Sequence, residues 1–174
     1  MVAEQVIARA RELKASFGVK CSKFSGAVSV ELVRAALAAA GIPTSSRDVF
    51  VRGVPVEVDL IIPHRAQEAI LGVLYEPHQV AAALEIKNSG SFGTATIEKV
   101  TSDFGRLREV GIACAYLTLE ERRGFRWAVS SERIGYPCFT LGWHKATGGP
   151  FEATAEWDQL VLFLENCRGK GNAS

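Results

Sequence analysis

The sequence predicts an α/β fold in which a mixed central sheet carries helices on its flanks. Apolar residues three and four positions apart predict helices near both ends of the chain. Between them lie alternating and continuously apolar stretches of strand length. This order of helices and strands is typical of layered α/β and α+β sandwiches. The chain has 174 residues, enough for a real hydrophobic core, and we expect a single domain over residues 1–174.

Two helices are predicted at the start of the chain. The first covers residues 2–16, where the apolar residues fall near one face. A polar loop is expected over 18–27. The second helix covers 29–41, because Ser29 suits its N-cap and Gly41 suits its C-terminus.

A β-hairpin is predicted next, over residues 47–63. The stretch alternates in polarity, and Gly53 is expected in the turn. The valines of its second half point one way, whereas Glu57 and Asp59 point the other. A short helix within 65–75 is then expected between strands.

The middle of the chain predicts a strand, a helix and a second strand. The first strand covers 79–87 and ends on Glu85 and Lys87, which share one face. A helix follows over 94–111 with a buried apolar stripe. The continuously apolar run 112–121 is expected to be an internal strand.

The last third of the chain is predicted to add strands over 124–133 and 136–143. A closing helix is expected over 156–167. The remaining residues, 168–174, are predicted to form a polar tail.

Composition and charge exclude several classes of protein. The formal net charge of +1 excludes a uniformly basic nucleic-acid-binding surface but leaves a local one open. No apolar run reaches the length of a membrane span, and the N-terminal stretch lacks the apolar core of a secretory signal. The four cysteines contain no C-x-x-C pair, so we expect no zinc site. Free thiols, a cytoplasmic location and no membrane partner are therefore expected.

Three charged side chains stand near the ends of two predicted strands: Asp59, Glu85 and Lys87. If these strands are neighbours, the three side chains converge at one edge of the sheet. Two adjacent carboxylates repel each other, which raises at least one pKa, and Mg²⁺ removes that penalty because it favours oxygen ligands. A nearby lysine can hold an attacking water or offset phosphate charge. The pattern therefore indicates phosphodiester cleavage.

In "VEVDLII" and "ALEIK" the chain resembles the PD-(D/E)xK nuclease superfamily, with Asp59 as the motif aspartate and Glu85 and Lys87 as the E-x-K. The resemblance covers roughly residues 28–120. It implies the restriction-endonuclease-like αβββαβ core. It also implies cleavage of nucleic-acid backbones with Mg²⁺, for which Mn²⁺ could substitute.

The resemblance further assigns roles within the site. Asp59 and Glu85 are expected to bind the metal together with the backbone carbonyl of Ile86. Glu31 matches the glutamate that the family's first core helix often carries, and it is a further candidate for catalysis. The chain departs from the namesake motif at Val58, which stands where the motif has proline.

Each of these residues also has a purely structural interpretation. Glu85 and Lys87 could form an ion pair on one strand face. Asp59 could cap a turn before Pro63. Glu31 suits the first turn of a helix, where the helix dipole favours any acid.

Two stretches are candidates for contact with nucleic acid. Ser89 and Ser91 belong to "NSGSFGT", whose backbone N–H groups could approach a phosphate, although a flexible connection would have the same sequence. Arg122 and Arg123 begin a basic stretch with interleaved aromatic residues that could hold a strand. A turn with core aromatic residues is the alternative.

These observations predict a magnesium-dependent endonuclease that acts on nucleic acid, with DNA as the expected substrate. The alternative is a non-catalytic nucleic-acid-binding or assembly subunit of the same fold. A metal enzyme acting on a small phosphate ester is a third hypothesis, disfavoured by the lack of a nucleotide-binding loop. A homodimer is expected if both strands of a duplex are cut. Participation of Glu57 in the site stays open.

Overall fold

The computed structural model describes the chain apart from residues 90–92, 126–127, 129, 147–148 and 171–174. Within the described chain, one sheet of seven strands forms in the order β3-β1-β2-β4-β5-β6-β7. The central strands β4, β5 and β6 are parallel, whereas β2 runs antiparallel to β1 and β4. The sheet is therefore mixed, as predicted. Its strands are β1 (Arg47–Val51), β2 (Val54–Pro63), β3 (Leu74–Tyr75), β4 (Val80–Ser89), β5 (Ala113–Arg122), β6 (Cys138–His144) and β7 (Phe151–Ala153).

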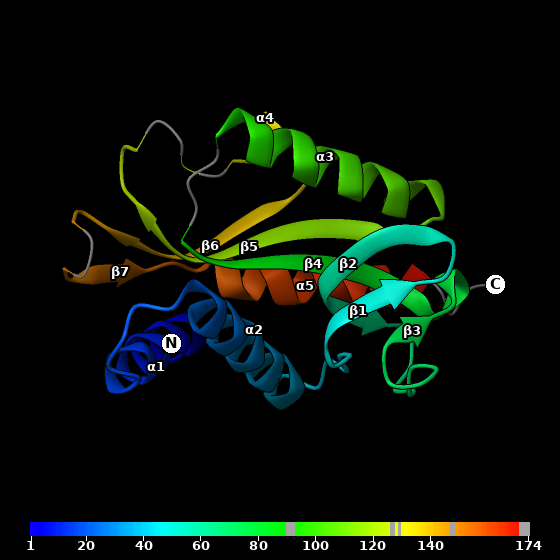
Figure 1. Cartoon of the computed structure of the whole chain (residues 1–174), viewed down its shortest axis with the longest axis horizontal. Helices are drawn as coiled ribbons and strands as arrows, with labels where there is room; N and C mark the ends of the chain where they lie inside the picture. Colours follow the sequence, from blue (N-terminus) through cyan, green and yellow to red (C-terminus); the bar gives the residue numbers. More distant parts are fainter. Residues whose placement is uncertain (90–92, 126–127, 129, 147–148, 171–174) are drawn as a thin grey trace.

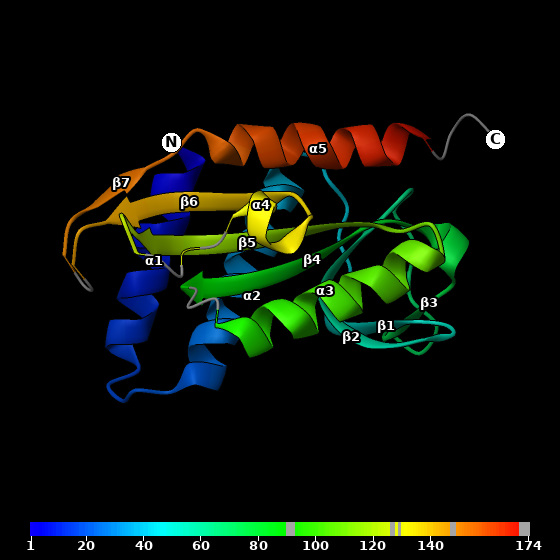
Figure 2. The same ribbon diagram turned by 90° about the horizontal axis from the view of Figure 1, so that it is seen from above.

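Helices cover both faces of this sheet (Figure 1). One face carries α3 (Thr94–Glu109) and the short α4 (Ser131–Ile134). The other face carries α1, α2 and α5, and Figure 2 shows α5 running alongside β6. These three helices are α1 (Val2–Ser16), α2 (Ser22–Ala39) and α5 (Glu156–Lys170).

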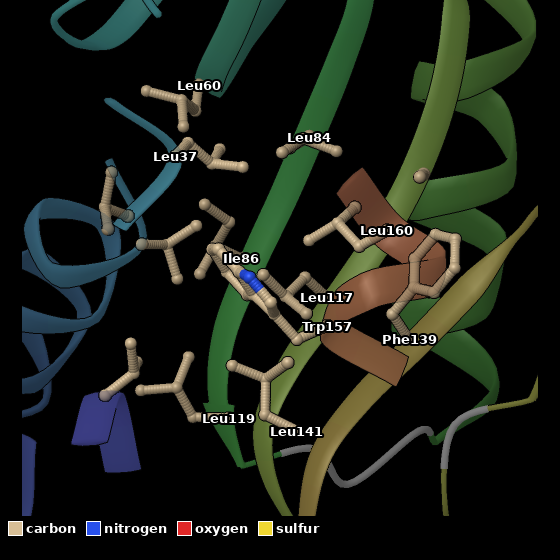
Figure 3. Close-up of a cluster of buried hydrophobic side chains, with 14 of the residues drawn as sticks. Leu37, Leu60, Leu84, Ile86, Leu117, Leu119, Phe139, Leu141, Trp157 and Leu160 are labelled. Atoms are coloured by element: carbon tan, nitrogen blue, oxygen red, sulfur yellow. The ribbon is translucent and has the colours of Figure 1, made fainter. Parts of the chain in front are cut away.

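Each face of the sheet has its own apolar cluster. Figure 3 shows the cluster under α5, where Trp157 and Leu160 pack with sheet residues that include Leu84 and Ile86. Successive side chains of a strand point to opposite faces. Leu84 and Ile86 of β4 face α1, α2 and α5. Glu85 and the residues two positions away from it along β4 therefore face α3.

Two glycines are required by the local geometry. Gly53 has a φ of +80° and forms the turn of the β1–β2 hairpin, as predicted. Gly142 lies where α1 approaches β6, and a Cβ at that position would stand 2.6 Å from the Cδ1 atom of Ile7. A side chain at position 142 would therefore displace the end of the Ile7 side chain.

The predicted start of the second helix is wrong. Helix α2 begins at Ser22, inside the expected loop, and its N-cap is Cys21, whose Sγ accepts a hydrogen bond from the Phe24 N–H. Ser29 lies buried within the helix and donates its hydroxyl to the carbonyl of Ser25. The stacking of Phe24 on Phe17 of the preceding connection stabilises the extra turns, although serine and glycine favour helices weakly.

The helix expected within residues 65–75 is also wrong. The segment instead contains a turn and the two-residue β3, and the 3₁₀ helix η1 (Pro77–Gln79) follows it. Leu71 and Gly72 both have positive φ angles, which a right-handed helix cannot accommodate. The Phe50 N–H donates to the carbonyl of Val73, so the segment pairs with the edge of β1. Sheet pairing outweighs the helical propensity of the sequence here.

The C-terminal third is partly as predicted. Strand β6 and helix α5 are confirmed, but α5 continues to Lys170, into the tail predicted from 168. The predicted strand over 124–133 is wrong at its end, where α4 forms; residues 126–127 and 129 lie outside the described chain. Strand β7 was not predicted. None of the described helices combines the length and apolar character needed to cross a membrane.

Candidate functional site

The sheet divides at the predicted site. The last residue pair that β2 and β4 share is Leu60 with Leu84. Beyond it, β2 continues beside β1 and β4 continues beside β5. We call this point the strand fork. Asp59 and Glu85 are the first residues beyond it on their two strands.

Burial along both strands changes at the strand fork. Residues 60–63 of β2 and 80–84 of β4 are buried without interruption, because the two stretches pair with each other and helices cover both faces of the sheet. Beyond the fork each strand loses a neighbour and the burial alternates. The charged residues Asp59 and Glu85 therefore stand at the positions where β2 and β4 separate. This local arrangement lets the charged groups at the strand fork reach water.

The Asp59 carboxylate bridges the two diverging strands. Its Oδ2 atom accepts hydrogen bonds from the Ile86 N–H at 2.8 Å and from Lys87 Nζ at 3.1 Å. The same Lys87 Nζ lies 2.5 Å from Glu85 Oε1. One ammonium group therefore joins two carboxylates from neighbouring strands. The Asp59 and Glu85 side chains are each about four-fifths buried, while that of Lys87 is 40% exposed.

Glu85 is held in an environment that disfavours its charge. Burial raises the pKa of its carboxyl group, and the negative charge of Asp59 raises it further, whereas Lys87 acts in the opposite direction. For Lys87, burial lowers the pKa, but the charges and hydrogen bonds of Glu85 and Asp59 outweigh it and raise the pKa overall. The two carboxylates thus need a cation between them.

Three residues near Glu85 were not predicted to belong to this region. Tyr116 is buried on β5 and pairs in register with Glu85. From the facing helix α3, Lys99 pairs with Asp103, and the Lys99 charge also acts on Glu85. The i, i+4 spacing of Lys99 and Asp103 was visible in the sequence but indicates only a helix surface pair. Their proximity to the fork depends on how α3 crosses β4.

Glu31 is placed away from this group. Its carboxylate pairs with Arg34 of the same helix at 2.7 Å. Helix α2 packs on the face of the sheet opposite to α3, through Val30, Val33 and Leu37. The described contacts of Glu31 therefore belong to its own helix. Glu57 is exposed and borders a small hollow that Glu85 also lines.

The candidates for nucleic-acid contact fall at the ends of β4 and β5. Ser89 is exposed at the end of β4, and Arg122 is exposed at the end of β5. Both line a hollow of about 590 Å³. Arg123 instead pairs with Glu152 of β7 at 2.7 Å. Ser91 lies outside the described residues.

Comparison with known proteins bears on the fold. Neither a family model nor a curated protein matches the chain. Among solved structures it is similar to NucC of P. aeruginosa ATCC27853 in a cAAA-bound form, with a TM-score of 0.63 and 10% sequence identity over 99% of this chain and 95% of NucC. The chain has a restriction-endonuclease-like fold. At this identity the likeness concerns the fold, so the expected αβββαβ arrangement is confirmed and the chemistry of the site is not decided by it.

If the strand fork cleaves nucleic acid, Glu31→Gln should weaken that cleavage by less than about 10-fold. Loss of a group that supports a metal ligand typically has a 10- to 100-fold effect, and Glu31 is held by Arg34 rather than by the strand fork. Single-turnover cleavage rates measure the difference. A larger loss would place Glu31 in the site through water or a second ion, and Arg34→Gln serves as the control for the helix itself.

We expect Glu85→Gln to stabilise the metal-free protein at pH 8 but not at pH 4. The folded-state pKa of Glu85 lies above its ordinary value of 4.5, so its favourable contribution to folding is complete below that value and is lost as pH rises through the folded-state pKa. Glutamine removes this ionisation. Urea unfolding in EDTA should show that the effect of the substitution on the free energy of unfolding becomes more favourable as the pH rises across this range.

The matched control for this measurement is Glu57→Gln, which removes the same charge at an exposed position of the neighbouring strand. Equal pH dependence of the two substitutions would mean that the environment of Glu85 does not disfavour its charge.

Proposed function

We propose that the chain is a metal-dependent endonuclease that hydrolyses phosphodiester bonds of nucleic acid, with DNA as the expected substrate, at the strand fork. The observation that carries the proposal is the placement of Asp59 and Glu85 on neighbouring strands around a single ammonium group, Lys87. The restriction-endonuclease-like fold supports it, because the predicted D…E-x-K pattern lies on the two central strands that diverge.

The donor set at the strand fork fits Mg²⁺. Two carboxylates supply hard oxygen ligands, and because burial and the charge of Asp59 raise the pKa of Glu85, a divalent cation would stabilise its ionised form. The described residues contain no group of three or more His, Cys, Asp or Glu side chains suited to a metal, so the carbonyl of Ile86 and water would complete the ligands. Mg²⁺, or Mn²⁺ in its place, would polarise the phosphate and stabilise its developing charge.

Lys87 is positioned for the chemical step. Its side chain reaches both carboxylates and is 40% exposed, so the ammonium can also meet a group arriving from solvent. Negative charge on the phosphate oxygens increases as water attacks phosphorus. We assign to Lys87 the orientation of that water and the stabilisation of this charge. Asp59, whose Oδ2 atom accepts the Ile86 N–H, fixes the two strands relative to each other.

A second candidate function is a non-catalytic nucleic-acid-binding or assembly subunit. The observation in its favour is that Lys87 already joins both carboxylates. A cation that belongs to the protein itself could hold the strand fork together permanently. This candidate predicts that divalent ions bind weakly and change nothing at the site.

Nicking of supercoiled plasmid separates the two functions. The parent protein should nick the plasmid with Mg²⁺ or Mn²⁺ and should be inactive in EDTA. The Asp59→Asn and Lys87→Ala variants, purified in the same way, control for a contaminating nuclease. Nicking that survives EDTA or both substitutions would exclude the strand fork as the site, and absence of nicking by the parent on supercoiled, linear and single-stranded DNA and on RNA would favour the non-catalytic subunit.

A further inference from the structure

Positive charge is concentrated between α1 and α2. Between Glu12 and Glu31, residues 13–30 contain three lysines and no aspartate or glutamate, although the net charge of the whole chain is only +1. The lysines accompany two phenylalanines, and together these five residues define what we call the α1–α2 shoulder: Lys14, Phe17, Lys20, Lys23 and Phe24. All of it precedes residue 28, outside the part of the chain that resembles the nuclease superfamily.

The α1–α2 shoulder presents aromatic surface among its lysines. Phe17 and Phe24 stack with ring centroids 4.0 Å apart and an interplanar angle of 14°. Phe17 nonetheless stays 45% exposed, and the neighbouring Val19 is 66% exposed. Lys20 and Lys23 are exposed as well. Aromatic faces between lysines are the surface on which unpaired bases stack while their phosphates are neutralised.

The α1–α2 shoulder lies beside the C-terminal end of β4, the strand that carries Glu85 and Lys87, although α1 and α2 cover the face of the sheet opposite to α3. The Lys14 ammonium donates a hydrogen bond to Oδ1 of Asn88, the residue after Lys87. The hollow of about 590 Å³ that Ser89 lines is also lined by Lys14. A second hollow, of about 470 Å³, extends from Lys14 to Lys20 and Phe24. Figure 2 shows the α1–α2 connection at the same end of the sheet as the end of β4.

Two acidic residues, Glu120 and Glu121, also line the first hollow. Arg11 of α1 binds the carboxylate of Glu120 through two guanidinium nitrogens. Burial lowers the pKa of Lys14, more than the nearby charge of Glu120 raises it. An anion arriving at Lys14 would therefore stabilise a partly desolvated ammonium.

We infer that the α1–α2 shoulder binds an unpaired nucleic-acid strand that leaves the strand fork, so that the preferred substrate carries a single-stranded arm. The inference rests on the proposed function and extends it to a class of substrate. Bases within a duplex are already stacked on each other and offer no free face to Phe17. An unpaired strand supplies both phosphates for the lysines and bases for the aromatic rings.

Salt-dependent binding tests the role of the lysines. The probe is a fluorescent single-stranded oligodeoxynucleotide, and fluorescence anisotropy in EDTA gives its affinity across a series of salt concentrations. Each phosphate contact on a single strand contributes about 0.7 to the slope of log affinity against log salt. The double substitution Lys20→Gln with Lys23→Gln should therefore reduce the slope by roughly 1.4.

The matched control removes two exposed arginines, Arg65→Gln with Arg106→Gln. Arg65 follows Pro63, which pairs with Val80 at the start of β4, and so lies at the opposite end of the sheet. This control has the same net charge as the lysine variant and should keep the slope of the parent. Equal slopes for the two double variants would overturn the inference, because charge alone would then explain the binding.

Substitution of Phe17 tests base stacking. Phe17→Ala should weaken binding of the single strand by roughly 5- to 150-fold, the range expected for one stacked base, with little effect on a blunt duplex of the same sequence. Phe17→Trp should retain the affinity of the parent, which separates stacking from damage to the contact with Phe24. Equal losses on single strand and duplex, or no loss, would overturn the inference.

The inference and the proposed function can fail separately. Binding in EDTA requires no cleavage, so a protein that binds the single strand through the α1–α2 shoulder but never nicks DNA would retain this inference and lose the nuclease function. The opposite outcome is a protein that nicks DNA with Mg²⁺ at the same rate with and without a single-stranded arm on the substrate. If substitution of the α1–α2 shoulder also leaves this rate unchanged, the nuclease function is retained and this inference is lost.

Discussion

Lys87→Ala should reduce the rate of phosphodiester cleavage by about 10²- to 10³-fold while the protein stays folded. This is the typical effect of removing one group that stabilises transition-state charge. Lys87 is the ammonium that contacts both Asp59 and Glu85, and no methylene or methyl group can replace it. Its side chain is 40% exposed, so truncation leaves no large buried cavity. Single-turnover cleavage separates this loss from changes in substrate binding.

The same substitution should tighten Mg²⁺ binding slightly, because Lys87 competes with the metal for the two carboxylates. Isothermal titration measures this directly. Lys99→Ala is the matched control: it removes an ammonium from α3 that pairs with Asp103 and also acts on Glu85, yet its cleavage rate should fall by only a few fold. If Lys87→Ala cleaves as fast as the parent, Lys87 is a salt-bridge partner and the proposed chemistry is wrong.

Asp59→Asn should lose metal affinity and cleavage together. Asparagine keeps an oxygen that can accept the Ile86 N–H, so the contact across the strand fork survives. It removes one of the two anionic ligands, and we expect Mg²⁺ affinity to fall by at least about 10-fold, since loss of a supporting residue alone typically has that effect. Cleavage at saturating substrate should fall by at least the same factor.

Comparison of the two variants assigns the roles. Lys87→Ala should bind Mg²⁺ and fail in the chemical step, whereas Asp59→Asn should be partly restored by raising the Mg²⁺ concentration. Urea unfolding of both variants in EDTA controls for stability. An Asp59→Asn protein with unchanged Mg²⁺ affinity would mean that the metal binds elsewhere, and the strand fork would then serve the structure of the sheet.

The sequence was sufficient to place the main strands of the site because their patterns have one interpretation. The alternation around Val56 and Glu57 predicts a strand with one polar face, and the run that ends at Leu84 predicts a strand buried on both faces. Asp59 and Glu85 stand where each pattern changes, which suggested a common edge. The divergence of β2 from β4 at that point is a property of pairing between distant segments, and no local pattern encodes it.

Predictions failed where distant contacts decide local conformation. Ser29 has the chemistry of an N-cap, but the packing of Phe24 on Phe17 extends the helix to Ser22. The segment around Leu71 has the composition of a helix, yet it pairs with β1 and forms one edge of the sheet. Lys99 had no signal that distinguished it from other surface lysines, because its approach to Glu85 depends on the position of α3.

The hydrogen bond from Ile86 to Asp59 gives the site its own spectroscopic reporter. Most amides of β4 are held by the backbone of a neighbouring strand, but the Ile86 N–H donates to a side-chain carboxylate. A charge-assisted bond of this kind is stronger than one between neutral groups, and it changes whenever the carboxylate gains another ligand. In a nuclear magnetic resonance spectrum the Ile86 amide should therefore move on titration with Mg²⁺. Its rate of exchange with deuterium should rise when Asp59 is replaced by alanine, while amides of buried residues such as Leu84 keep their protection.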